Sequence, residues 1–211
     1  MNGRESDLVV LVADKNMEAS VRGLLSRREA LGLRQIRYEI YVHVRRDPGC
    51  FLGGHDFLRP MAGRTAHALV LFDRIGSGRE KNTRESLEDL VTGRLASSGW
   101  DDRAAAIVID PELEVWVWSD SPHVGRVLGW REAYPDVQTW LRERGMWAEG
   151  ERKPEDPKAA VERVLRHVRK PRSSAMYGKL ADLVSFQRCT DPSFLRLRQI
   201  LAGWFAEDTR L

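Results

Sequence analysis

Apolar residues in the first half of the chain fall into four short runs, separated by polar stretches with helical spacing. The runs predict strands at residues 7–13, 36–44, 67–72 and 105–109. Three of the runs are almost continuously apolar, which is typical of strands buried on both faces of a parallel sheet. Strands that alternate with helical segments predict an α/β fold, with a small, mostly parallel sheet flanked by helices.

The run at 36–44 differs from the other three because apolar and polar side chains alternate along it. Its predicted inward face carries Ile36, Tyr38, Ile40, Val42 and Val44. Such alternation indicates a strand with one exposed face, so we expect it near an edge of the sheet. Asp47-Pro48-Gly49, which follows, predicts a turn.

From about Pro135 the strand signal stops and only helical periodicity remains. We therefore divide the chain into an α/β domain at 1–130 and an all-helical extension at 131–211, packed on that domain. Two Asp-Pro pairs predict helix starts, with Asp110 and Asp191 as the capping residues.

Composition supports a folded protein that does not cross a membrane. The chain has 211 residues, of which 31% are charged and 42% hydrophobic, a balance typical of globular proteins. No apolar run is long enough to cross a bilayer, and the polar start MNGRES does not resemble a secretory signal, so we expect a cytoplasmic protein. Cys50 and Cys189 are too few for a disulfide framework, and we expect free thiols.

Acidic residues follow three of the predicted strands. Asp14 follows the first run, Asp73 the third, and Asp110 with Glu112 and Glu114 the fourth. The carboxyl ends of parallel strands open onto one edge of the sheet, where carboxylates can hold a hard cation such as Mg²⁺. The predicted metal ligands are Asp14, Asp73, Glu112 and Glu114.

We predict catalytic roles for Asp73, Glu18 and His43. Glu18 lies one helical turn after Asp14, and His43 ends the alternating strand, where it can serve in proton transfer. Helix capping is the alternative for part of the acidic set, because Asp14 and Asp110 occupy ordinary N-cap positions. Asp73 is followed by an arginine and a glycine loop, and capping does not explain it.

The strings around these acids resemble those of known proteins. An acid after the first strand, an Asp after a central strand and DPELEVW after a third look like a Toprim-like fold. More closely, VLVADK, LFDRIGSG and PELEVWVWSD resemble a small bacterial family that accompanies methylation-associated anti-phage defence systems. The resemblance also takes in the segments DPGC and RCTD, and so spans most of the chain.

The resemblance implies a divalent-metal-dependent nuclease that acts on phosphodiesters of DNA or RNA, with other defence proteins as partners. Toprim-like domains bind Mg²⁺ through a glutamate after the first strand and an Asp-x-Asp after a later one. In this chain Asp14 replaces the glutamate, and Ile75 stands where the second aspartate would be. The acids that follow the fourth apolar run, Asp110, Glu112 and Glu114, would have to supply the missing ligand.

Two further motifs are less specific. The loop Gly76-Ser77-Gly78 can cradle a phosphate, which leaves open a nucleotide-binding module, although the Lys-Ser/Thr ending of a P-loop is absent and a plain connection is the alternative. His43, Cys50 and His55 have irregular spacing and no Cys-x-x-Cys pair, which does not favour a zinc site.

The helical half supports an alternative function, a non-catalytic sensor or assembly subunit. Basic residues that can follow a phosphate backbone, or lie on a solvated helix face, are Lys158, Arg163, Arg166, Arg169, Lys170, Arg172, Arg188, Arg196 and Arg198. Trp118, Trp130 and Trp147 fit no clear apolar stripe, so we expect them to be partly exposed at a protein interface. The net charge of +3 does not by itself indicate nucleic acid.

Overall fold

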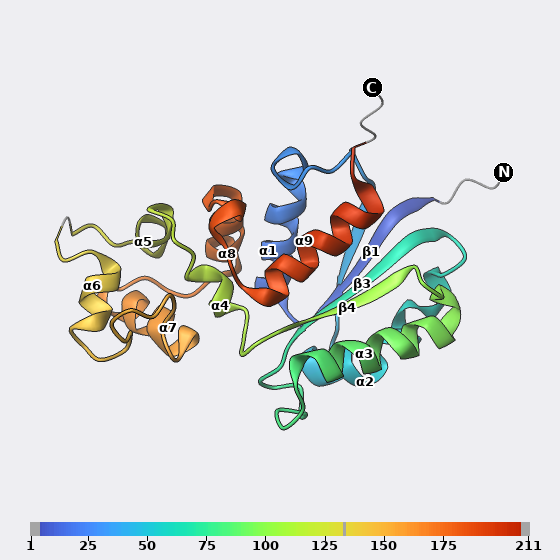
Figure 1. Cartoon of the computed structure of the whole chain (residues 1–211), viewed down its shortest axis with the longest axis horizontal. Helices are drawn as coiled ribbons and strands as arrows, with labels where there is room; N and C mark the ends of the chain where they lie inside the picture. The colour runs from blue at the N-terminus through green and yellow to red at the C-terminus, as the bar shows by residue number, and fades with distance from the viewer. Residues whose placement is uncertain (1–4, 133, 208–211) are drawn as a thin grey trace.

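The computed structural model describes residues 5–132 and 134–207 as an α/β fold around one four-stranded sheet (Figure 1). The strands are all parallel, in the order β2–β1–β3–β4. Their bounds are β1 (Ser6–Val12), β2 (Tyr38–Val42), β3 (Thr65–Asp73) and β4 (Ala104–Ile109). The predicted fold class and the four predicted strands are confirmed.

The strands differ in burial as their sequences predict. β1, β3 and β4 are buried on both faces, because helices cover both sides of the sheet. β2 lies at an edge, as predicted, and only Ile40 on its inward face is buried. The prediction is wrong for Val44, which is 93% exposed because β2 ends at Val42 and the chain turns away towards the next helix.

Helices flank the sheet on both sides. Their bounds are α1 (Lys15–Ser26), α2 (Arg46–Leu58), α3 (Arg84–Leu95), α4 (Glu114–Val117), α5 (His123–Leu128), α6 (Val137–Arg142), α7 (Pro157–His167), α8 (Ser174–Leu183) and α9 (Pro192–Phe205). In Figure 1, α2 and α3 cover one face of the sheet, whereas α1 and α9 lie on the other. α5, α6 and α7 form a lobe to the side of the sheet.

The first helix is shorter than its sequence suggests. Met17, Val21, Leu24 and Leu25 form an apolar stripe that predicts a helix from about residue 16 to residue 30. In the structure α1 ends at Ser26, and a 3₁₀ turn, Arg28–Leu31, follows. Gly32 ends that turn with φ +71°, a left-handed conformation that glycine adopts without strain.

The C-terminal helices pack on the sheet layer. α8 packs along α1, and α9 packs on β4. Gly23 of α1 allows the first contact, because a Cβ there would lie 2.7 Å from the Cβ of Ala181. The guanidinium of Arg27 also donates to the carbonyl oxygens of Ala181 and Val184, at 2.9 and 2.7 Å. Beyond β4 the described part of the chain adds no strand to the sheet, as predicted.

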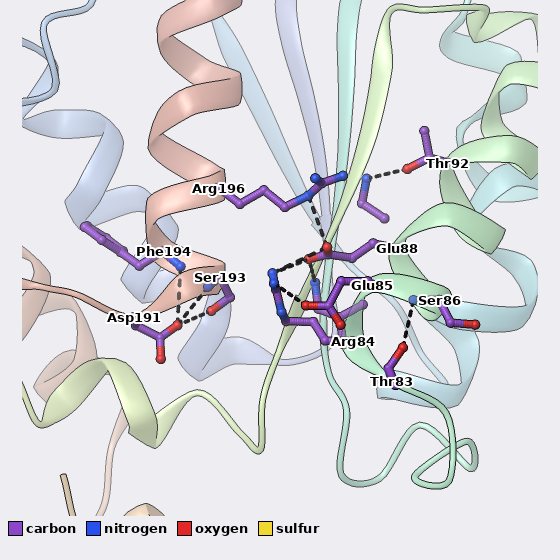
Figure 2. A network of polar contacts seen from close by, with 12 residues as sticks. Thr83, Arg84, Glu85, Ser86, Glu88, Thr92, Asp191, Ser193, Phe194 and Arg196 are labelled. Atoms are coloured by element: carbon purple, nitrogen blue, oxygen red, sulfur yellow. Dashed lines mark hydrogen bonds and ion pairs between the residues drawn. The ribbon is translucent and has the colours of Figure 1, made fainter. Parts of the chain in front are cut away.

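Side chains of α3 cover the outer edge of β4 (Figure 2). The carboxylate of Glu88 accepts from the Val108 N–H at 3.1 Å, and the Thr92 hydroxyl accepts from the Ala106 N–H at 3.1 Å. Glu88 is only 1% exposed, and both Arg84 of α3 and Arg196 of α9 meet its carboxylate. Two backbone donors of this edge strand are thereby satisfied within the chain.

The two predicted Asp-Pro helix starts have different outcomes. Asp191 is the N-cap of α9, and its carboxylate accepts from the Ser193 and Phe194 backbone N–H groups. The prediction is wrong for Asp110, because the next helix begins only at Glu114 and the Asp110 carboxylate pairs with Arg74 at 2.8 Å. The N-cap position of α4 is occupied by Leu113, three residues after Asp110.

Two simpler expectations can be compared with the structure. Cys50 and Cys189 are free thiols, as predicted, and both are buried. No helix in the described part of the chain combines the length and apolar character needed to cross a bilayer. The polar segment before the first strand lies largely outside the described residues.

Candidate acidic site at the carboxyl edge of the sheet

Five carboxyl groups gather where the parallel strands end. We call this group the acidic edge, and it consists of Asp14, Asp47, Asp73, Glu112 and Glu114. The charges of the other four all act on Asp73, so the group lies within the range of charge–charge interaction. Asp14, Glu112 and Glu114, predicted as metal ligands together with Asp73, thus lie within electrostatic range of it, and so does Asp47.

Asp14 lies between β1 and α1 and caps the helix. Its Oδ1 accepts from the backbone N–H groups of Asn16 and Met17, both at 2.9 Å. The capping alternative is therefore confirmed for this residue, but capping does not remove its charge from the site. The Asp14 carboxylate still contributes to raising the pKa values of Asp47 and Asp73.

Asp73 is the last residue of β3 and lies at the centre of the group. Its Oδ1 is buried and accepts no hydrogen bond from the described residues. Burial raises the pKa of its carboxyl well above the usual range, and the charges of Asp47 and Glu114 raise it further. The site therefore favours a proton on Asp73 or a cation beside it.

Asp47 is a member of the site that the sequence reasoning missed. It lies in the first turn of α2, where its Oδ1 accepts from the Asp73 backbone N–H at 2.8 Å. Burial raises the pKa of Asp47, and the charges of Asp14 and Glu112 add to the effect. The available signal was that Asp47, like the other acids, comes soon after a strand, but the Pro-Gly that follows it predicted only a turn.

Glu114 is held rigidly at the start of α4. Its side chain is 1% exposed, and its Oε1 accepts from the Tyr177 hydroxyl and meets Arg172 Nη2, both at 2.5 Å. Its Oε2 is buried and has no hydrogen-bond partner among the described residues. The helical half thus orients one oxygen of Glu114 and leaves the other without a partner.

Glu112 has its own cation from the helical half. Its Oε2 forms an ion pair with Nζ of Lys158, in the first turn of α7. Burial works against the charge on Lys158, but the hydrogen bond and charge of Glu112 outweigh it and raise the lysine pKa. The acidic edge therefore contains five carboxyl groups, with Lys158 and Arg172 paired to two of them.

Glu18 and His43, predicted as assisting residues, have their side-chain polar contacts outside this group. Glu18 forms ion pairs with Lys15 and Arg22 along α1, at 2.8 and 2.9 Å. His43 is buried against α2, where its Nδ1 accepts from the Arg45 N–H at 3.1 Å. Burial and the Arg45 charge lower the pKa of His43, so the imidazole is neutral at pH 7.

The donor set can be tested against a divalent cation. No three Asp, Glu, His or Cys side chains in the described ranges already stand at metal-holding positions. Mg²⁺, however, is usually bound by one or two carboxylates together with waters and substrate phosphates. Asp73 Oδ1 and Glu114 Oε2 are the buried carboxylate oxygens without a hydrogen-bond partner among the described residues, and they would be the ligands in that smaller set.

The glycine loop is filled by a carboxylate of the chain itself. The backbone N–H groups of Gly76 and Gly78 both donate to Oε1 of Glu80, at 3.0 and 3.1 Å. Positive φ angles at the two glycines, +93° and +75°, allow this arrangement. The backbone N–H groups of Gly76 and Gly78, which the sequence suggests as donors to a phosphate, therefore already donate to an anionic side chain.

A cleft of about 910 Å³ lies in the helical half, away from the acidic edge. Trp118, Trp130 and Trp147 line it, together with Arg152 and Arg188. The expectation of exposed indoles is wrong for Trp118 and Trp147, which are buried in an edge-to-face contact and donate to backbone carbonyl oxygens. Trp130 is partly exposed.

Taken together, the fold and the site define an α/β protein with a carboxylate-rich strand edge that the helical half completes. Comparison of the chain with protein-family models, with curated proteins and with solved structures finds no match.

Proposed function

We propose that this protein is a component of a bacterial anti-phage defence system, and that it binds Mg²⁺ at the acidic edge to cleave phosphodiesters of DNA or RNA. The observation that carries the proposal is the uncompensated negative charge around Asp73 and Glu114. Lys158 and Arg172 offset only two of the five carboxylates. A buried excess of negative charge is unfavourable unless a cation or protons neutralise it.

The residues of the chain have distinct roles in this proposal. Asp73 and Glu114 present the unpartnered oxygens, and Asp14 and Asp47 add negative charge that attracts the cation. When bound, the metal supplies activation of water and stabilisation of charge on the phosphate. The resemblance of the strand-end strings to a defence-associated family supports the biological context.

Calorimetric titration with Mg²⁺ and Mn²⁺, together with cleavage assays on DNA and RNA, tests the proposal. We expect the wild-type protein to bind the cation and Asp73→Asn to lose both binding and cleavage. Asp110→Asn is the matched control, because Asp110 follows β4 but pairs with Arg74 instead of joining the acidic edge. Absence of cation binding in the wild type, with cleavage unchanged in Asp73→Asn, would rule the proposal out.

The cleft in the helical half favours a second candidate, a non-catalytic subunit that binds a protein partner there. Concave surfaces lined by tryptophan and arginine are suited to anchoring a partner. This candidate predicts a co-purifying protein that Arg188→Glu loses and that Asp73→Asn retains. A partner that survives Arg188→Glu and Arg152→Glu together contradicts it.

A further inference from the structure

Both glutamates that follow β4 meet a cation from the helical half. Lys158 in the first turn of α7 pairs with Glu112, and Arg172, which precedes α8, pairs with Glu114. These cations are not enclosed by the pairs that they form. The side chain of Lys158 is 38% exposed and that of Arg172 is 32% exposed, so both side chains are open to solvent beside the acidic edge.

Each cation has hydrogen-bond donors that its glutamate does not use. An ammonium group has three donors, and a guanidinium has five. Arg172 donates through Nε to the Tyr177 hydroxyl at 2.8 Å and meets Glu114 through Nη2. Its Nη1 lies 3.8 Å from the Glu162 carboxylate, beyond hydrogen-bond distance.

The two cations are also held in place. Lys158 lies on α7, whose apolar face is buried through Ala160, Val161 and Val164. Arg172 is fixed by its bond to Tyr177, which is itself buried. A fixed cation loses less conformational freedom when it binds an anion than a mobile surface side chain does.

We propose that Lys158 and Arg172 form a phosphate-binding pair at the rim of the acidic edge. Arginine and lysine are the side chains that bind phosphate most readily, the first through its planar fork and the second as a point charge. The inference rests on the proposed function and specifies which group of the substrate is recognised and by which residues. Glu112 and Glu114 occupy one side of each cation, and the phosphate oxygens bind the exposed side.

The alternative is that the two cations only neutralise the glutamates. The two explanations differ in what the wild-type protein binds. If Lys158 and Arg172 bind phosphate, the wild type has a phosphate affinity that Lys158→Gln weakens and that Glu112→Gln, by removing a repelling charge, strengthens. If the two cations only balance the glutamates, the wild type has no phosphate affinity for Lys158→Gln to remove.

The test is the affinity for inorganic phosphate, measured by calorimetry in EDTA so that no divalent cation takes part. Lys158→Gln and Arg172→Lys should each weaken phosphate binding. For Lys158→Gln the affinity should fall by about tenfold or more, because the phosphate loses a charged hydrogen-bonding partner. Glu112→Gln should strengthen binding several-fold, and the double variant Glu112→Gln/Lys158→Gln should lose that gain. Lys179→Gln is the control, since Lys179 is an exposed lysine on α8 outside the site.

Competition experiments identify the source of the phosphate group. Displacement of phosphate by a dinucleoside monophosphate supports a phosphodiester ligand, and displacement by a nucleoside 5′-monophosphate alone supports a terminal phosphate. Undetectable phosphate binding, or equal affinity in wild type, Lys158→Gln and Arg172→Lys, overturns the inference. These measurements are made without metal, so their outcome does not depend on whether the acidic edge binds a cation. A negative result would therefore overturn the phosphate-binding proposal without deciding the proposed cation site.

Discussion

At the scale of single residues, Asp73 is an acid in a position that disfavours its charge. Its Oδ1 has no hydrogen-bond partner among the described residues, and neighbouring carboxylates surround it. A residue kept only for stability would not be expected under these conditions, because a neutral side chain of similar shape avoids the repulsion. Strongly perturbed acids of this kind cluster at functional sites.

Asp73→Asn should therefore stabilise the protein in EDTA. At pH 7 we expect the free energy of unfolding to rise by about 1–2 kcal/mol, in line with the gains seen when functional strain is removed. Chemical denaturation of both proteins at pH 7 measures the difference. A loss of stability in Asp73→Asn would show that the carboxylate has a stabilising role that its environment does not suggest.

The pH dependence of stability follows from the same residue. Burial and neighbouring charge raise the folded-state pKa of Asp73, so the folded state binds a proton that the unfolded state has already lost. This contribution to stability is present below the unfolded pKa, near 4, and disappears as pH rises through the folded pKa. Between those two values we expect stability to fall with pH in the wild type, and to fall less steeply in Asp73→Asn.

At the scale of secondary-structure elements, two of the contacts that join the C-terminal helices to the sheet layer lend themselves to direct tests. One is the close approach of α1 and α8 at Gly23, and the other is the group of Arg84, Glu88 and Arg196 between α3 and α9. The first depends on the absence of a side chain and the second on a buried charge with two partners. Each can be tested with a substitution and a neighbouring control.

Gly23→Ala should destabilise the protein, because the new Cβ would lie 2.7 Å from Ala181 Cβ and 2.9 Å from the Gly178 carbonyl oxygen. The expected cost is about 1–3 kcal/mol, the range for overpacking a fixed contact. Gly203→Ala in α9 is the control, since a Cβ there has open space and the helix gains about 0.5–1 kcal/mol. Thermal unfolding midpoints that shift in opposite directions confirm the prediction.

Glu88→Ala should be among the most destabilising substitutions on α3. It removes the acceptor of the Val108 N–H and leaves Arg84 and Arg196 without their shared partner. Breaking a buried pair in this way costs roughly 3–5 kcal/mol. Glu85→Gln removes an exposed partner of the same Arg84 and should leave the denaturation midpoint unchanged. Equal effects of the two variants would contradict the structural account.

At the scale of the whole molecule, the two halves of the chain are interdependent. α8 rests on α1, α9 rests on β4, and Arg172 and Tyr177 from the second half position Glu114 at the sheet edge. The acidic edge is complete only when both halves are folded together.

Unfolding should accordingly occur in one transition. We expect the thermal midpoint from far-ultraviolet circular dichroism, which reports all helices and strands, to coincide with that from tryptophan fluorescence. Four of the seven tryptophans lie in residues 1–130 and three lie beyond, so fluorescence weights the two parts of the chain differently from circular dichroism. An independently unfolding part would therefore separate the two curves. Two resolved transitions would support the predicted division near residue 130 as a boundary between independent domains.

The strands and the strand-end acids were predictable from sequence because continuous apolar runs and parallel topology leave few alternatives. The partners of those acids were not. Tyr177 and Glu114 are 63 positions apart, and their contact arises only from the docking of α8. Asp47 was missed for a local reason, since the chain enters α2 through Arg46 at φ +50°, a backbone conformation that periodicity does not reveal.

The covered edge of β4 limits how copies of this protein can associate. A sheet that extends through many copies needs two unpaired edge strands in each copy. One edge pairs with the preceding copy and the other pairs with the following copy. Glu88 and Thr92 occupy backbone donors of β4, whereas β2 pairs in the described residues with β1 alone. Edge-to-edge pairing of native copies is therefore opposed at β4, which leaves β2 as the edge through which two copies can pair.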